Sequence, residues 1–214
     1  MPDHLVTSDQ MNLLRVGERV ITDVKNLLIN GSGNQTHSNV TGLNHLATAL
    51  SYNYGNAFGP FRPRRIIAIA QQTGGGNCDQ TGAISYAYCR DLLDNLHESA
   101  WAYVPGHTFA LIGLTGTNTD EWIAVDPWVE HAVPTLYKHH FSHGNNLQFY
   151  SKKTGTGKNA YTSTKVLNQI QTIIQATLPA QIFLNSTVIY NQYSHGTPWK
   201  NGISYKYIEQ IVLD

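Results

Sequence analysis

The chain has few charged residues, and this shortage excludes two classes of protein. Only 13% of its 214 residues are charged, and Lys+Arg and Asp+Glu balance at 14 each. A protein that binds nucleic acid or an anionic membrane surface presents a basic face or tail, so we expect no nucleic-acid partner. No apolar stretch approaches the ~18–20 residues that a membrane span needs. We therefore expect no membrane span either.

Cysteine is equally scarce, and the two thiols, Cys78 and Cys89, are too few for a disulfide framework. If residues 78–96 are helical, Cys89 lies about 16 Å along the axis from Cys78 at ~1.5 Å per residue. A disulfide needs Cα atoms within roughly 7 Å, so the two cysteines are not partners. We expect Cys89 to be a small buried hydrophobic residue, and the free thiols indicate a reducing working compartment.

Hydrophobic patterning predicts helices in the first half of the chain and mainly strands after them. The expected helices span residues 10–28 (capped by Ser8 or Asp9), 45–52, 78–96 and 162–177. The expected strands span residues 66–70, 101–104, 108–114, 121–125, 181–190 and 204–213. This order predicts an α+β fold. Because no repeat or linker divides the chain, we expect one domain over residues 1–214, whole or as part of a longer protein.

Cys78 is the residue that carries most information about function. It follows a glycine-rich stretch, residues 74–76, and opens the predicted central helix. Unpaired backbone N–H groups and the macrodipole at a helix N-terminus favour the thiolate form. The same N–H groups point to where an oxyanion develops during acyl transfer. Gln72, or in its place Gln71, is expected to add a side-chain donor there, and Asn77 is expected on the same oxyanion or substrate-binding side.

Two later motifs, Gly106-His107 and Asp126-Pro127-Trp128, flank a predicted β-hairpin. If the turn of this hairpin is centred between residues 116 and 117, the numbers of any two residues paired across the strands sum to 233. The numbers of His107 and Asp126 have this sum. The two would then be direct cross-strand neighbours with Cβ atoms roughly 5 Å apart. We predict that Asp126 holds one imidazole nitrogen of His107 and leaves the other for Cys78. Trp128 is expected either to line the acyl channel or to pack in the core.

Other interpretations of these residues compete with a catalytic triad. Cys78 as a buried structural cysteine is common for this residue type. The glycine triplet also suits a flexible loop or a phosphate nest, although the Lys-Ser/Thr of a P-loop does not follow it. His139, His140 and His143 lack the spacing of a zinc motif, and a zinc site built from the triad residues is the other metal interpretation. We expect no metal ion and no cofactor.

Three motifs in order resemble the papain-like/transglutaminase-like superfamily, and most closely its bacterial toxin and effector domains. They are Gly76-Asn77-Cys78, Gly106-His107-Thr108-Phe109 and Val125-Asp126-Pro127-Trp128. The resemblance covers residues 66–130, about a third of the chain. It implies a papain-like/transglutaminase-like core, in which a central helix carries Cys78 at its N-terminus and packs on an antiparallel sheet that carries His107 and Asp126.

The resemblance also implies a reaction. Such domains perform cysteine-dependent acyl transfer on protein glutamine side chains, by deamidation or transamidation through a thioester. The expected partner is a protein substrate in a host cell, reached by secretion into the host cytoplasm, and the first residues, Met-Pro-Asp-His, carry no signal-peptide pattern. The alternatives are a papain-like cysteine endopeptidase with the same triad, a metallohydrolase, and a degenerate catalytic fold kept for partner binding. Asp79, where many members carry Trp, favours the last of these.

Overall fold

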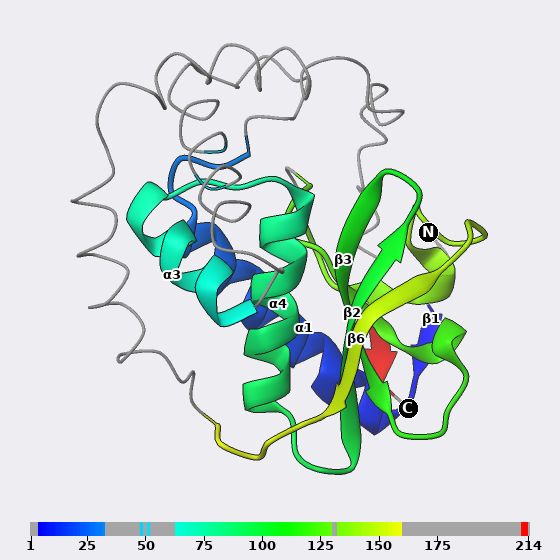
Figure 1. The fold of residues 1–214 in the computed structure, drawn as a ribbon. Coiled ribbons are helices and arrows are strands. Elements are labelled where there is room, and N and C mark those ends of the chain that lie inside the picture. Colours follow the sequence, from blue (N-terminus) through cyan, green and yellow to red (C-terminus); the bar gives the residue numbers. More distant parts are fainter. Residues whose placement is uncertain are drawn as a thin grey trace, which may run out of the picture.

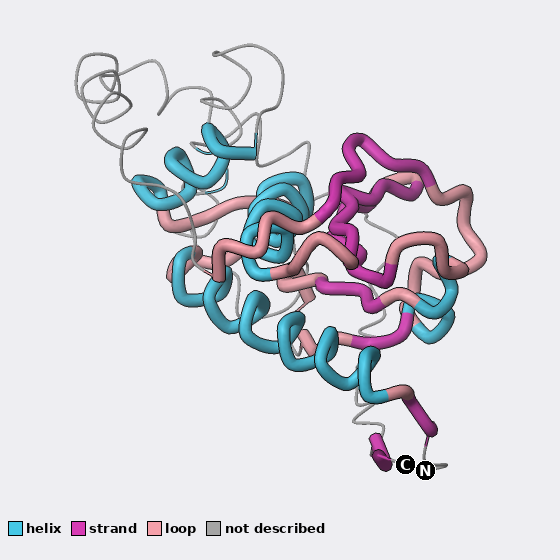
Figure 2. The backbone as a smooth tube through the Cα atoms, turned by 90° about the horizontal axis from the view of Figure 1, so that it is seen from below, coloured by secondary structure: helices cyan, strands magenta, loops and turns pink. Residues whose placement is uncertain are grey.

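The structure is a computed structural model that describes residues 4–32, 48, 51, 63–129, 132–159 and 211–213. Within these ranges the chain is α+β, as the sequence predicts, with helices packed on an antiparallel sheet. The helices are α1 (Ser8–Leu27), α3 (Pro63–Thr73) and α4 (Cys78–Leu92). They lie together on one side of the sheet, with α4 next to it (Figures 1 and 2).

Five antiparallel strands form the sheet, in the spatial order β5-β4-β3-β2-β6. In chain order they are β2 (His97–Val104), β3 (His107–Leu114), β4 (Ile123–Val125), β5 (Thr135–Leu136) and β6 (Gln148–Thr154). Two short 3₁₀ helices, η1 (Thr119–Glu121) and η2 (Tyr137–His139), lie in the connections. A separate parallel pair joins β1 (His4–Val6) to β7 (Ile211–Leu213).

Helix α1 begins at Ser8, so its cap lies one residue before the first of the two predicted caps. Thr7, not Ser8 or Asp9, is the N-cap, because the glutamine three residues on completes a capping box. The Gln10 N–H donates to Thr7 Oγ1 over 3.1 Å, and Gln10 Oε1 accepts from the Thr7 N–H over 3.0 Å. Among the described residues, no helix has both the length and the hydropathy required to cross a membrane.

The strand predicted at residues 66–70 is wrong, because this segment lies inside helix α3. All five of its residues are buried. A fully buried run has no apolar/polar periodicity, so its isoleucines favour a strand by composition alone. Pro63 at the first helical position fits the start of a helix, where no intrahelical N–H bond is lost.

Helix α4 starts at Cys78 as predicted but ends at Leu92 rather than at residue 96. Leu93 leaves the helix with an extended backbone (φ −78°, ψ 144°), and Leu96 is 63% exposed. Asp94 closes the turn that follows, since its Oδ1 accepts from the Leu96 N–H over 2.9 Å. The chain then enters β2.

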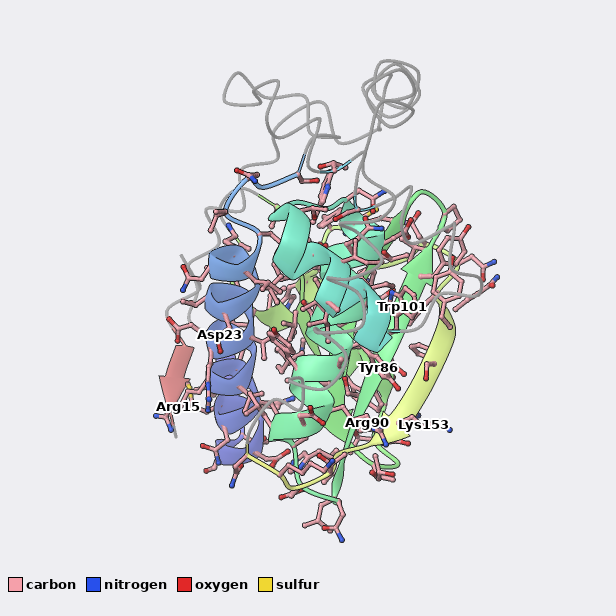
Figure 3. The ribbon with its side chains drawn as sticks, turned by 60° about the vertical axis from the view of Figure 1, so that its left-hand side comes forward. Arg15, Asp23, Tyr86, Arg90, Trp101 and Lys153 are labelled. Atoms are coloured by element: carbon pink, nitrogen blue, oxygen red, sulfur yellow. The ribbon has the colours of Figure 1, made fainter. Side chains whose placement is uncertain are left out.

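Side chains tie the second half of α4 to the edge strand β6. The Tyr86 hydroxyl and Ser151 Oγ are 2.9 Å apart, and Arg90 Nε donates to the carbonyl oxygen of Thr154 over 3.2 Å. Figure 3 shows Tyr86 and Arg90 on the part of α4 that faces β6. These contacts fix the helix along the sheet, and so they help to fix its N-terminus.

A glycine lets the first half of α4 approach the backbone of β3. A Cβ on Gly82 would lie 3.0 Å from the backbone nitrogen of Phe109 and 3.1 Å from the carbonyl carbon of Thr108. The neighbouring atoms belong to a central strand and cannot move aside as a side chain can. The small residue at position 82 therefore sets the distance between the nucleophile helix and the strand that begins with His107.

Predicted elements at residues 162–177, 181–190 and 204–210 lie outside the described residues, whereas β7 covers the end of the last predicted strand. Of the helix predicted at 45–52, residues 48 and 51 are described, and both are helical.

Replacing Gly82 by valine should push α4 away from β3. Overpacking of this kind costs about 2 kcal/mol, so we expect the free energy of unfolding in urea to fall by that amount. Glu18→Val, at an exposed position of α1, controls for the helix propensity of valine and should cost below about 1 kcal/mol. Equal losses in the two variants would contradict the close approach.

Candidate active site

Cys78 is the first residue of α4, and its position is set by a capping box. Asn77 is the N-cap, and its Oδ1 accepts from the Asp79 N–H over 2.9 Å. In return, Gln80 Oε1 accepts from the Asn77 N–H over 2.9 Å. The N–H groups of a first helical turn have no partner within the helix, so Cys78 lies at a positive helix end with donors directed outward.

The glycine stretch before Cys78 is a hydrogen-bonded segment, not the flexible loop of the alternative interpretation. Residues 74–76 run parallel to the chain that follows α1, where Gly31 and Gly75 form a β-bridge. The Asn30 N–H donates to the Gly74 carbonyl oxygen over 2.7 Å. Gly74 has a φ of +67°, a conformation that glycine adopts readily. The nucleophile helix is thereby attached to the end of α1.

His107 and Asp126 form a buried pair, as predicted. His107 Nε2 donates to Asp126 Oδ2 over 2.7 Å, and the two residues are 1% and 3% exposed. A two-residue turn precedes His107 and places it at the start of β3. Gly106 of this turn has a φ of +85°, as the third residue of a type II turn requires.

The predicted register of this hairpin is wrong by two residues. In the β3–β4 ladder Ala110 pairs with Val125 and Leu111 with Ala124, so paired numbers sum to 235 instead of 233. The reason is the turn, because η1 extends the connection and moves its centre toward residue 118. His107 and Asp126 are therefore diagonal neighbours, not directly opposed. Side chains alternate with a period of two, so the even shift left both on the same face.

Asp126 accepts hydrogen bonds at both carboxylate oxygens. Besides His107 at Oδ2, the Trp128 backbone N–H donates to Oδ1 over 3.2 Å. The Nε2 atom of His140 lies 3.4 Å from Oδ2. Two hydrogen bonds, from β3 and from the Pro127-Trp128 turn, thus fix the buried carboxylate, and His140 from the segment after η2 contacts it without a hydrogen bond at Nε2.

The electrostatics of the pair favour a charged His107. Burial alone would lower the pKa of His107, but the negative charge of Asp126 and its hydrogen bond raise that pKa to about 10. Burial opposes ionisation of Asp126 too, yet His107 and the contact with His140 hold the pKa of Asp126 well below its ordinary value. The pair is an imidazolium–carboxylate ion pair at neutral pH.

The thiol of Cys78 lies beside this imidazole. Its hydrogen bond to His107 and its charge are among the causes that raise the pKa of His107. Asp126 takes Nε2, so Nδ1 is the ring nitrogen that remains for the thiol. Cys78 is half-buried, whereas Cys89 is fully buried, and burial raises the pKa of the Cys89 thiol. The two cysteines therefore have different chemistry.

Aromatic rings enclose His107. The centroids of Trp128 and Phe141 each lie 5.1 Å from that of the imidazole, and Phe109 stacks on it at 5.7 Å. Such rings exclude water from the ion pair and lower the local dielectric constant, which strengthens charge interactions. Neither Phe141 nor Phe109 was a predicted site residue.

Tyr150 is a further neighbour of the site that sequence reasoning missed. The β2–β6 ladder pairs Trp101 with Ser151 and Ala102 with Phe149, so Tyr150 is the extra residue of a β-bulge. Bulges redirect side chains near active sites, and Tyr150 packs on Trp101 with ring centroids 5.0 Å apart. Burial and the negative charges of Asp79 and Cys78 raise the pKa of Tyr150. No local sequence pattern marks a bulge at this position.

The remaining predicted site residues have distinct surroundings. Asn77 is 1% exposed and serves the cap. Trp128 is 7% exposed, packs on His107 and forms one wall of a cavity of about 250 Å³ between α1 and the segment after Asp126. Neither Cys78 nor His107 lines this cavity, so the predicted role of Trp128 in an acyl channel stays a prediction. Gln72 lies in α3, and its side chain is outside the described part of the structure, so its oxyanion role stays a prediction.

Asp79 is a half-buried carboxyl group next to the nucleophile. Thr108 Oγ1 donates to its Oδ1 over 3.2 Å. Burial raises the pKa of Asp79, while Thr108 and the charge of His107 oppose that shift. A raised pKa weakens the negative charge that this side chain places beside a thiolate.

The histidine-rich segment has no arrangement typical of a metal site. His140 contacts Asp126, whereas His143 Nε2 lies 3.1 Å from Asp120 Oδ1 on the surface. Across the described ranges, no three His, Cys, Asp or Glu side chains gather closely enough to hold a metal ion.

The stability of the fold should depend on pH through the His107–Asp126 pair. The pKa of His107 is raised above 6.5, so its stabilisation is complete below that pH and is lost as the pH rises toward about 10. The pKa of Asp126 is lowered from 3.8, so its stabilisation is present above about pH 4 and lost on acidification. Asp126→Asn should therefore cost about 3–5 kcal/mol near pH 6 and progressively less toward pH 10.

Urea unfolding of both proteins across this range measures the difference. Asp120→Asn removes an exposed carboxylate that also faces a histidine, and it should stay within about 1 kcal/mol of wild type at every pH. A cost of Asp126→Asn that does not change with pH would show that the pair is not charged.

Comparison with protein-family models and with curated proteins gives no match. What is established is an α+β chain in which the N-terminus of α4 brings Cys78 to a buried imidazolium–carboxylate pair. The function is therefore argued from this geometry.

Proposed function

We propose that the chain is a cysteine-dependent acyl-transfer enzyme that acts on carboxamides, with Cys78, His107 and Asp126 as a catalytic triad. The observation that carries this proposal is the buried pair of His107 and Asp126 beside a half-buried thiol at a helix N-terminus. A structural cysteine needs none of these features. Perturbed charges concentrated at one nucleophilic side chain are typical of a functional site.

The first half-reaction forms a thioester. The Cys78 thiolate attacks the carboxamide carbon, a C–S bond forms, and the carbonyl electrons move to oxygen. The His107 imidazolium then transfers its Nδ1 proton to the nitrogen, the C–N bond breaks and ammonia leaves. Asp126 remains ionised throughout and keeps the ring oriented by its bond to Nε2. The N–H of Cys78, in the first turn of α4, is placed to stabilise the oxyanion.

The second half-reaction regenerates the thiol. Neutral His107 takes a proton from water or from a primary amine, which attacks the thioester carbon and expels the thiolate. Water converts a glutamine side chain to glutamate, and an amine forms a new amide. The imidazole is the base here and the acid before, so the same positioned ring serves both steps.

The choice of a protein glutamine as substrate is supported by the resemblance of the three motifs to bacterial toxin and effector domains. In this proposal the chain acts in the cytoplasm of a host cell on a host protein. A peptide bond is the other carboxamide that the same triad attacks, and proteolysis is the second outcome that the experiments distinguish.

An activated thiol is expected to react before any substrate is known. At about pH 6, iodoacetamide should modify Cys78 at least about tenfold faster than Cys89, because only a thiolate is a strong nucleophile and Cys89 is fully buried. Peptide mass spectrometry measures both rates. His107→Gln, although less stable because it leaves the buried Asp126 carboxylate without its charged partner, should slow Cys78 by a similar factor while it remains folded. If Cys78 is unreactive in the wild-type protein, the chain is a binding module and the catalytic proposal fails.

The reaction itself is tested by incubating host-cell lysate with wild type and with Cys78→Ala. Wild type should raise the mass of a target glutamine peptide by about 1 Da through deamidation, or cross-link it to an added amine. Cys89→Ala is the matched control, since it removes the other thiol and should keep activity. Protein fragments that depend on Cys78 would instead identify an endopeptidase. Activity lost with a chelator and kept in Cys78→Ala would identify a metallohydrolase.

A further inference from the structure

Asp126 has a second histidine neighbour, which the triad mechanism does not use. His140 follows η2 and is 6% exposed, and its Nε2 atom lies 3.4 Å from Asp126 Oδ2. Its ring packs on Phe109 and Phe141, with centroids 4.6 and 4.3 Å away. These contacts hold the ring beside Asp126 Oδ2, whereas the Trp128 N–H binds Oδ1.

Hydrogen bonds at the other nitrogen fix the tautomer of His140. The Ser142 backbone N–H is directed at Nδ1 over 3.4 Å, so Nδ1 must be an acceptor. Ser142 Oγ lies 2.7 Å from the same nitrogen and is therefore its second donor. With Nδ1 as acceptor, the proton of a neutral imidazole is on Nε2, which faces the carboxylate.

The charges around His140 favour this neutral state. Burial lowers the pKa of His140, and the nearby charge of His107 lowers it further, against the opposing effect of Asp126. The titratable neighbours are His107 from β3, Asp126 after β4, and Tyr137 and His139 from η2. The Tyr137 ring centroid lies 6.4 Å from that of His140, and His139 borders the same small cavity. Cys78 affects the pKa of His107 but is not among the groups that shift that of His140.

We infer that His140 is a positioning residue that acts through Asp126: its neutral Nε2–H lies 3.4 Å from Asp126 Oδ2, has no hydrogen-bond partner elsewhere in the described structure, and, with the Trp128 N–H, fixes the orientation in which Asp126 holds His107 toward Cys78. This role rests on the proposed acyl-transfer function. The two histidines around Asp126 therefore have different roles. His107 donates and accepts the proton that the reaction transfers, whereas the Nε2 proton of His140 is not transferred.

Glutamine and methionine at position 140 form a matched pair of variants. Both are unbranched and similar in size, but only the glutamine amide supplies a donor to Asp126. Alanine is unsuitable, because a cavity of about 20 Å³ already adjoins Asp126 and His140 and has room for a water molecule. A larger space would admit water, which is itself a donor.

The test is the rate of Cys78 alkylation by iodoacetamide between about pH 5 and 9, which requires no substrate. His140→Gln should follow wild type within about twofold, and His140→Met should react about tenfold more slowly near pH 6 because the polar N–H group beside the charged carboxylate is lost. An ordinary cysteine thiol in water is largely ionised near pH 9, so alkylation depends least on the orientation of His107 there and the three rates should converge. A merely structural defect would slow His140→Met at every pH.

Three results would overturn the inference: His140→Met as fast as wild type near pH 6, His140→Gln as slow as His140→Met, or a deficit of His140→Met that persists near pH 9. Should His140→Met fail to fold, Ser142→Ala decides, since it removes one donor to Nδ1 and should slow alkylation about threefold. An unchanged rate there rejects the role of His140. A wild-type Cys78 no more reactive than Cys89 would instead reject the proposed function itself.

Discussion

The site depends on one buried ion pair, that of His107 with Asp126. Burying two charges is costly, and an apolar pair of similar volume often stabilises a fold as well or better. The chain nevertheless surrounds this pair with Trp128, Phe109 and Phe141 and satisfies the carboxylate at both oxygens. The burial of a charged pair is hard to explain by stability and is readily explained by chemistry at the adjoining thiol.

The rest of the fold places Cys78 against that pair. The capping box of Asn77 and Gln80 determines where α4 begins, and the bridge of Gly75 to Gly31 determines where its first turn lies relative to α1. Gly82 then sets how near the helix comes to β3. The capping box, the β-bridge and Gly82 each fix the position of the backbone, so rigid elements rather than a mobile loop place the thiol.

The sequence predicted that Cys78, His107 and Asp126 lie together more accurately than it predicted the elements that carry them. Cys78 was identified because glycines and a capping residue mark a helix start. His107 and Asp126 were paired correctly because side chains alternate between the two faces of a strand, so a register error of two residues leaves both on the same face. Residues 66–70 were misassigned because complete burial removes periodicity. The positions of His140 beside Asp126 and of Tyr150 beside the site could not have been predicted. His140 follows an irregular segment and Tyr150 sits at a bulge, and neither feature has a pattern in local sequence. The papain-like or transglutaminase-like identity of the core remains a prediction.

The separation of the two cysteines has a consequence for redox chemistry. Both lie in α4, about 16 Å apart along its axis at ~1.5 Å per residue, and Cys89 is inaccessible. A peroxide that oxidises Cys78 to a sulfenic acid therefore finds no resolving thiol at Cys89, and an internal disulfide cannot form to protect it. Low-molecular-weight thiols become the route of recovery, and without them oxidation proceeds to the sulfinic acid. The proposed nucleophile thus depends on the glutathione pool of the compartment in which it works.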